Sequence, residues 1–206
     1  MPIYCELPIW NGVFEPLNTV SNLAFIVAAY FVWKLAARTG ESLVRRQQYA
    51  LAVILATIGI GSGLWHYYGT GWTFAMDVIP IQLFLLTFLW FLISQLHHSW
   101  LVRIGVMLGF VATTILVPII APFASGYIGA LVFAYGLSYF VYTRDRKQGR
   151  YFVITLLIFS LSLTTRQLDL PTCELTHGHG IHLFWHMLNA YVLYRFAKTL
   201  TAQSER

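Results

Sequence analysis

Seven apolar stretches divide the chain, and they restrict its fold more than any other feature of the sequence. They extend over Leu17–Leu35, Tyr49–Tyr67, Thr73–Leu96, Trp100–Ile120, Ser125–Thr143, Tyr151–Thr165 and Gly180–Leu200. One helical crossing of a bilayer needs roughly 20 apolar residues, so each stretch predicts a membrane-spanning helix. Only 10% of the residues are charged, too few to cover a water-soluble globule. We predict an all-α membrane protein, a single seven-transmembrane helix bundle over residues 1–206.

The basic residues indicate how this bundle is oriented. Twelve of the thirteen Lys and Arg residues fall on one side: Lys34, Arg38, Arg45, Arg46, Arg103, Arg144, Arg146, Lys147, Arg150, Arg195, Lys198 and Arg206. Because Lys-rich and Arg-rich loops stay in the cytoplasm, the N-terminus is predicted outside and the C-terminus inside. The net charge of +5 thus reports topology and not a nucleic-acid partner. On the outer side, Arg166 and Asp169 are expected to form an ion pair.

The two cysteines lie in segments that are predicted outside. A disulfide between Cys5 and Cys173 would join the N-terminal segment to the loop after the sixth helix, in a compartment that permits oxidation. Two unrelated free thiols are the alternative. Within the second stretch, Gly59 and Gly63 have GxxxG spacing, which predicts close packing of a neighbouring helix.

Four titratable side chains inside the predicted helices fall at one depth. His66 ends the outward-running second helix, Asp77 begins the inward-running third, and His182 and His186 begin the inward-running seventh. At about 1.5 Å per residue, all four lie within roughly 10 Å of the outer boundary. Such groups are costly in a bilayer, so each is a candidate functional residue.

The spacing of these residues favours a metal site. His182 and His186 are four residues apart and share one helical face. With His66 they supply three imidazoles, the ligand count of a catalytic zinc site that keeps a position for water. Zinc lowers the pKa of a coordinated water toward 7. Asp77 could then act as general base, and Ser62, one turn before His66, could stabilise an oxyanion.

Other interpretations of the polar residues stay open. Membrane histidines often serve only as hydrogen-bonding residues between helices. His177 and His179, in a Gly-rich loop before the last helix, are rival metal ligands. Glu15, Asn18 and Asn22 follow helical spacing and are expected to face the bundle interior, where hydrogen bonding between helices and cation binding or catalysis are both open.

Five short motifs occur in a fixed order along the chain. They are Cys5–Glu6, Glu15–Leu23 (EPLNTVSNL), Gly61–His66 (GSGLWH), Asp77 followed by Pro80, and His182–His186 (HLFWH). Together they resemble the alkaline ceramidase family of the CREST superfamily, seven-helix membrane hydrolases that also include the adiponectin receptors. The seven-helix frame of that family covers nearly the entire chain.

The resemblance implies a site and an activity. It implies Zn²⁺ held by His66, His182 and His186, with Ser62 and Asp77 assisting. It implies hydrolysis of the amide bond of a ceramide-like membrane lipid, which yields a fatty acid and a sphingoid base near the non-cytoplasmic side. Hydrolysis of a phospholipid ester and a non-catalytic, metal-stabilised receptor are the alternatives.

The N-terminal segment departs from the family. Animal ceramidases have a Ca²⁺ site here, built from acidic and amide side chains. Glu6 and Glu15 match that site, but Ile3 and Pro8 offer no side-chain oxygen, which argues against calcium binding. The remaining polar set is a candidate second cation site or structural polar site: Glu6, Glu15, Asn18 and Asn22.

Overall fold

Eight α-helices make up the fold in the computed structural model, which describes residues 4–6, 15–96, 99–121 and 125–204. The helices are α1 Pro16–Ser21, α2 Leu23–Arg38, α3 Ser42–Tyr68, α4 Gly71–Leu96, α5 Trp100–Ile120, α6 Gly126–Arg144, α7 Arg146–Leu168 and α8 His182–Ser204. The described ranges contain no β-strand. The first predicted helix is therefore two helices, α1 and α2, which meet at Asn22.

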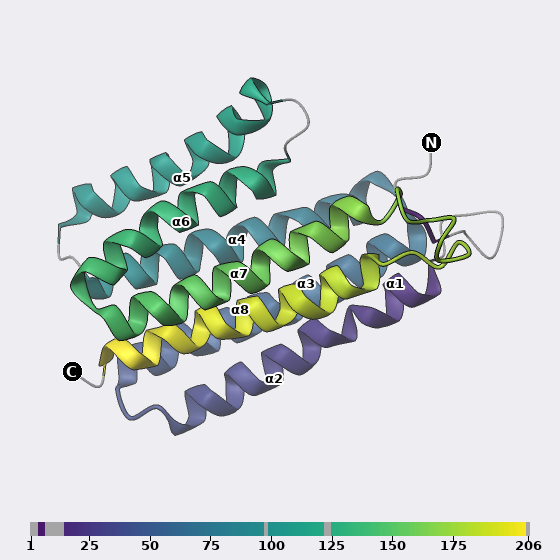
Figure 1. Cartoon of the computed structure of the whole chain (residues 1–206). Helices are drawn as coiled ribbons and strands as arrows, with labels where there is room; N and C mark the ends of the chain where they lie inside the picture. Colours follow the sequence, from purple (N-terminus) through teal and green to yellow (C-terminus); the bar gives the residue numbers. More distant parts are fainter. Residues whose placement is uncertain (1–3, 7–14, 97–98, 122–124, 205–206) are drawn as a thin grey trace.

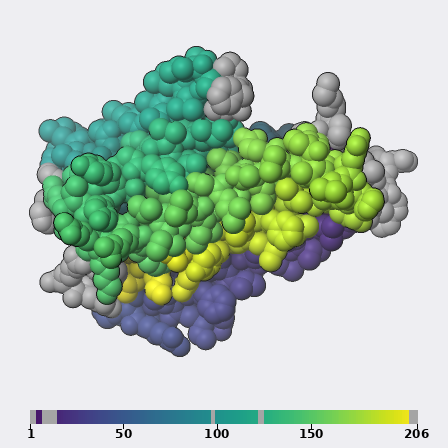
Figure 2. All heavy atoms as spheres, viewed as in Figure 1, coloured from purple at the N-terminus to yellow at the C-terminus, as the bar shows by residue number. Residues whose placement is uncertain are grey.

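The helices lie side by side, with α8 in the middle of the bundle (Figure 1). In that view α3 and α4 lie behind α7 and α8, α2 covers one side, and α5 and α6 extend from the other. α8 packs against α1, α2, α3, α4 and α7. In the space-filling view only a strip of α8 is visible between α7 and α2 (Figure 2). Residues on α8 are thus well placed to meet residues from several other helices.

The composition of the helices confirms a helical, multi-pass membrane protein. Among the described residues, six helical segments are long and apolar enough to cross a membrane, with α1 and α2 counted as one segment. α5 shows the clearest need for lipid, because Phe110 is its only buried residue and Leu108, Ile115 and Leu116 are exposed. α8 is not among the six, although its 23 residues are long enough. A seventh crossing stays a prediction.

Four of the basic residues lie at the facing ends of two neighbouring helices. Lys34 and Arg38 belong to α2, and Arg45 and Arg46 belong to α3. Only three residues, 39–41, separate these two helices. The short turn brings the four charges to one end of the bundle, where α6 also gives way to α7 (Figure 1). Arg206 lies outside the described residues.

The GxxxG pair accounts for only part of the packing of α3. A Cβ atom at Gly59 would lie 2.9 Å from the Ile26 side chain and 3.1 Å from the Asn22 carbonyl, so this glycine does let α2 approach closely. A Cβ atom at Gly63 would meet nothing nearer than 3.9 Å, which is ordinary van der Waals contact. The close approach on the opposite side of α3 depends on Gly61, which the GxxxG pattern does not include.

Candidate metal centre

Three buried histidines meet at the end of the bundle that also holds the N-terminal segment. His66 lies in the last turn of α3, and His182 and His186 lie in the first two turns of α8. Their potential ligand atoms lie within 4.8 Å of one another, and each residue is at most 2% exposed. Nitrogens that share one tetrahedral zinc lie about 3.4 Å apart. Small side-chain rotations would therefore bring all three onto one ion, and this group could bind a metal.

Two neighbouring side chains fix the outward-facing nitrogens of His66 and His186. The Glu15 carboxylate lies 2.7 Å from His66 Nδ1, and the Glu15 amide also donates to the His66 carbonyl. Ser21 Oγ lies 2.7 Å from His186 Nδ1 and donates its own hydrogen to the Asn18 carbonyl. Ser21 Oγ is therefore free to accept from His186 Nδ1. Both contacts favour a proton on Nδ1 of each ring, which would leave Nε2 available to a metal.

The third histidine has an unpaired ring nitrogen. His182 Nδ1 is buried and has no hydrogen-bond partner among the described residues. Buried polar atoms without partners are rare, so this nitrogen fits a site that a bound group completes. The Tyr4 ring covers the cluster, with its centroid 4.1 Å from the His182 ring and 4.9 Å from the His66 ring. Burial raises the pKa of Tyr4, so its hydroxyl stays protonated at neutral pH.

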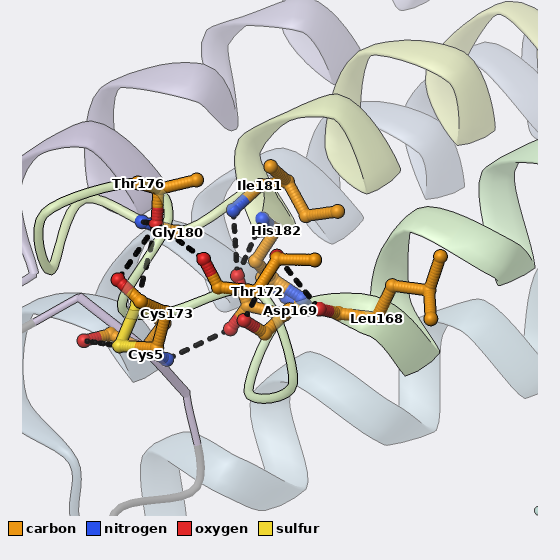
Figure 3. The surroundings of a disulfide bond; sticks show 9 residues. All are labelled: Cys5, Leu168, Asp169, Thr172, Cys173, Thr176, Gly180, Ile181 and His182. Atoms are coloured by element: carbon orange, nitrogen blue, oxygen red, sulfur yellow. Dashed lines mark hydrogen bonds between the residues drawn. A yellow bond between two sulfur atoms is a disulfide. The ribbon is translucent and has the colours of Figure 1, made fainter.

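A carboxylate that sequence reasoning did not assign to the site anchors the start of α8 (Figure 3). Asp169 Oδ1 accepts from the Ile181 amide at 2.7 Å and from the His182 amide at 2.9 Å, and Oδ2 accepts from the Cys5 amide at 2.8 Å. The predicted disulfide between Cys5 and Cys173 is confirmed. Together these bonds hold the N-terminal segment and the loop before α8 against each other, next to His182.

The predicted ion pair between Arg166 and Asp169 is wrong. In the described ranges no such pair is found, because backbone amides occupy the Asp169 carboxylate. The Arg166 guanidinium instead lies over two aromatic rings, 5.3 Å from the centroid of Tyr127 and 5.9 Å from that of Trp185.

A close crossing of α3 and α4 brings Ser62 and Asp77 together. Pro80 has no N–H, so the Met76 carbonyl one turn earlier lacks its helical donor. That carbonyl lies against Gly61, where a Cβ atom would collide with it. Ser62 follows Gly61 and Asp77 follows Met76, and the Ser62 hydroxyl is placed to hydrogen-bond the Asp77 carboxyl. The proline and the glycine thus set the distance between these two side chains.

Two neighbouring cavities lie inside the bundle, and the larger adjoins the histidines. This cavity, about 240 Å³, is lined by polar side chains that include Ser62, Asp77, Arg166, His182 and His186, together with apolar side chains. The smaller, about 50 Å³, is almost entirely apolar and lies between α4, α6, α7 and α8. The two share Ile81 and Tyr127 in their walls. The smaller cavity is thus adjacent to the polar site, and the packed rings of Phe88, Phe152 and Phe196 line it deeper in the bundle.

The polar set at the start of the first span is tied together by hydrogen bonds. Glu6 accepts from the amides of Leu17 and Asn18 at 2.7 and 2.8 Å and so caps α1. Burial raises the pKa of Glu6, and these two bonds oppose the rise. Glu15 accepts from the Asn18 side chain, and Asn22 donates to the Asn18 carbonyl. Of the helical set, Glu15 bonds across to His66 on α3, whereas the Asn18 and Asn22 bonds are local, so hydrogen bonding between helices and cation binding both stay open.

Other predicted residues lie apart from the cluster. His177 and His179 are exposed in the loop before α8, and neither belongs to the group that could hold a metal. Ile3 and Pro8, on which the argument against calcium depends, lie outside the described residues.

Asn18 Oδ1 and Asn22 Oδ1 are buried and accept no hydrogen bond from a described residue.

Comparison with known proteins adds no relative. No protein-family model matches the chain, and no curated protein matches it.

Proposed function

We propose that this protein is a zinc-dependent membrane hydrolase that cleaves the amide bond of ceramide-like lipids to a fatty acid and a sphingoid base. The observation that carries the proposal is the meeting of His66, His182 and His186, buried and within 4.8 Å of one another, beside a cavity that also holds Ser62 and Asp77. The helices are predicted to cross the membrane seven times, with this site near the non-cytoplasmic side.

The ligand set fits zinc and favours a catalytic site. Structural zinc sites have four protein ligands, whereas catalytic sites have three and keep one position open. The group found among the described residues has three, all imidazoles. When bound, zinc would supply Lewis-acid activation of water and of the amide carbonyl.

Asp77 and Ser62 would do the proton transfer and charge stabilisation. Asp77 lines the cavity but is not in the ligand group. Its carboxylate would take a proton from the attacking water as the new C–O bond forms, and deliver it to the nitrogen as the C–N bond breaks. The Ser62 hydroxyl would donate a hydrogen bond to the carbonyl oxygen as negative charge develops there.

The apolar cavity supports a lipid substrate. Its walls of Leu85, Phe88, Leu193 and Phe196 would surround an acyl chain while the amide lies at the histidines. These contacts would stabilise a bound substrate mainly by burying its apolar surface. A water-soluble amide without a long apolar chain would therefore gain nothing from them.

The test pairs zinc content with hydrolysis on the same preparation. Asp77→Asn should keep zinc and lose about 10²- to 10⁴-fold in the rate of ceramide hydrolysis, the usual contribution of a general base. Asp145→Asn, at the opposite end of the bundle, is the matched control and should keep both. Hydrolysis by Asp77→Asn at the parent rate would refute the assignment. If the parent cleaves only phospholipids, or no lipid amide or ester at all, the ester hydrolase or the receptor replaces this proposal.

A further inference from the structure

The cavity beside the histidines contains a fixed positive charge. Arg166, on α7, is half-buried and lines the cavity together with His182 and Trp185. Its guanidinium lies over the rings of Tyr127 and Trp185. A planar cation that contacts two aromatic rings loses much of its freedom to move, so its position in the cavity wall is well defined.

Among the described residues, this guanidinium forms no direct ion pair with a carboxylate. Across the described ranges, no carboxylate oxygen lies within 4.0 Å of its nitrogens. Three carboxylates near this end are already engaged: Glu6 with the amides of α1, Glu15 with His66, and Asp169 with three backbone amides.

No other described acidic residue forms an ion pair with Arg166. Glu174 is exposed in the loop before α8. Asp77 lines the same cavity and interacts with Ser62. Asp77 is near enough to Arg166 for an electrostatic interaction, but the two side chains form no direct ion pair. The residues outside the described ranges include one acidic side chain, Glu205, which follows the C-terminal end of α8 in the sequence.

An unpaired cation at this depth calls for a ligand. Arginine inside a membrane protein is costly unless an anion or a set of acceptors meets it. Its fork of N–H groups matches a carboxylate in two parallel hydrogen bonds. Ceramide offers no charge to this group, whereas a lipid amide with an acidic head group does.

We propose that Arg166 binds the carboxylate of an anionic lipid amide, so that N-acyl amino acids are preferred over neutral amides of the same chain length. The inference rests on the proposed amide hydrolysis, keeps its reaction, and makes an anionic lipid amide, in place of a neutral one such as ceramide, the preferred substrate. The acyl chain would occupy the apolar cavity, the amide would lie at the histidines, and the carboxylate, only two bonds from the amide nitrogen in an N-acylglycine, would meet Arg166. Trp185, which the guanidinium contacts, lies on α8 directly before His186, so the cation and the metal ligands are close neighbours.

The first experiment compares two substrates that differ in one group. N-oleoylglycine carries a carboxylate where N-oleoylethanolamine carries a neutral alcohol. The parent should prefer the acid in kcat/KM, and Arg166→Gln should lower that preference by about 10- to 100-fold, the usual effect of a charge-assisted hydrogen bond. Arg166→Lys keeps the charge without the fork and should fall between the two. An unchanged preference in a folded Arg166→Gln protein would overturn the inference.

A matched control separates this role from general packing of an arginine on rings. Arg195 also lies over an aromatic ring, 3.9 Å from the Tyr151 centroid, but its donors bond the Thr155 hydroxyl and the Tyr151 carbonyl. Arg195→Gln should leave the ratio between the two substrates unchanged. An equal loss of preference in both variants would also overturn the inference.

A binding measurement separates this inference from the hydrolase proposal. In the Asp77→Asn protein, which should not consume the lipid, N-oleoylglycine should raise the unfolding temperature more than N-oleoylethanolamine does, and Arg166→Gln should abolish the difference. Selective binding without turnover by the parent would keep the anion site and refute the hydrolase. Turnover of both lipids, with a ratio that Arg166→Gln leaves unchanged, would keep the hydrolase and refute the anion site.

Discussion

Replacing Asp169 with Asn should weaken zinc binding although Asp169 is not among the predicted ligands. Its two oxygens accept three backbone hydrogen bonds, two from the residues that begin α8 and one from Cys5 (Figure 3). Asparagine keeps the oxygen that faces Ile181 and His182, but it turns an NH₂ group toward the Cys5 amide, which is also a donor. One bond is lost, and the other two lose their charge.

The expected magnitude follows from these bonds. A hydrogen bond to a charged group contributes about 1.5–3 kcal/mol, and a buried donor without a partner adds a comparable penalty. Asp169→Asn should therefore lower the free energy of unfolding by about 2–4 kcal/mol. Because the carboxylate holds the His182 backbone, zinc affinity should also fall by about 10- to 100-fold, as for other groups that orient metal ligands.

The assay is competition for zinc against a chelator, with thermal unfolding measured on the same samples. Asp145→Ala is the matched control, because Asp145 caps α7 by accepting from the amides of Lys147 and Gln148. Loss of that cap should cost about 0.5–2 kcal/mol of stability and leave zinc affinity unchanged. If Asp169→Asn is destabilised in the same way but binds zinc like the parent, the carboxylate only anchors the loop and does not position His182.

Three further predictions concern the frame of the site. Gly61→Ala should lower stability by about 1–3 kcal/mol through overpacking and reduce hydrolysis. Gly63→Ala should change neither, because its Cβ would meet nothing nearer than 3.9 Å. Equal effects of the two changes on unfolding temperature and rate would contradict this. Cys5→Ser removes a link between residues 168 positions apart and should lower the unfolding temperature while zinc content is kept. The chain-entropy limit is about 5 kcal/mol, and an unchanged temperature would contradict a stabilising role. Phe196→Ala enlarges the apolar cavity and should shift hydrolysis toward longer acyl chains in a ceramide series, and an unchanged chain-length profile would count against the acyl-chain site.

The sequence predicts the histidine cluster because its members obey simple geometric rules. His182 and His186 share a face through their four-residue spacing, and the alternating direction of the helices places His66 at the same end. The disulfide could be predicted because both cysteines fall at that end. These inferences need only helix periodicity and topology, which apolar patterning indicates strongly.

Asp169 and Gly61 could not be predicted in the same way. The partners of Asp169 are backbone amides 12, 13 and 164 positions away, and backbone amides leave no trace in a sequence. Gly61 matters because Pro80, on another helix, frees the Met76 carbonyl that faces it. The GxxxG rule considers one helix alone and so selects Gly63, which packs loosely. Contacts of this kind depend on the register between two helices, which patterning does not supply.

The composition of α8 follows from its place in the bundle. It is too polar to count among the six apolar spans because it carries His182, His186, Asn189 and Arg195. Exposed to lipid, such a helix would be costly. Here α1, α2, α3, α4 and α7 contact it, and the first three of those polar residues are at most 3% exposed. A polar helix is therefore tolerable in this position, and it is the position from which its histidines can meet residues of three other helices.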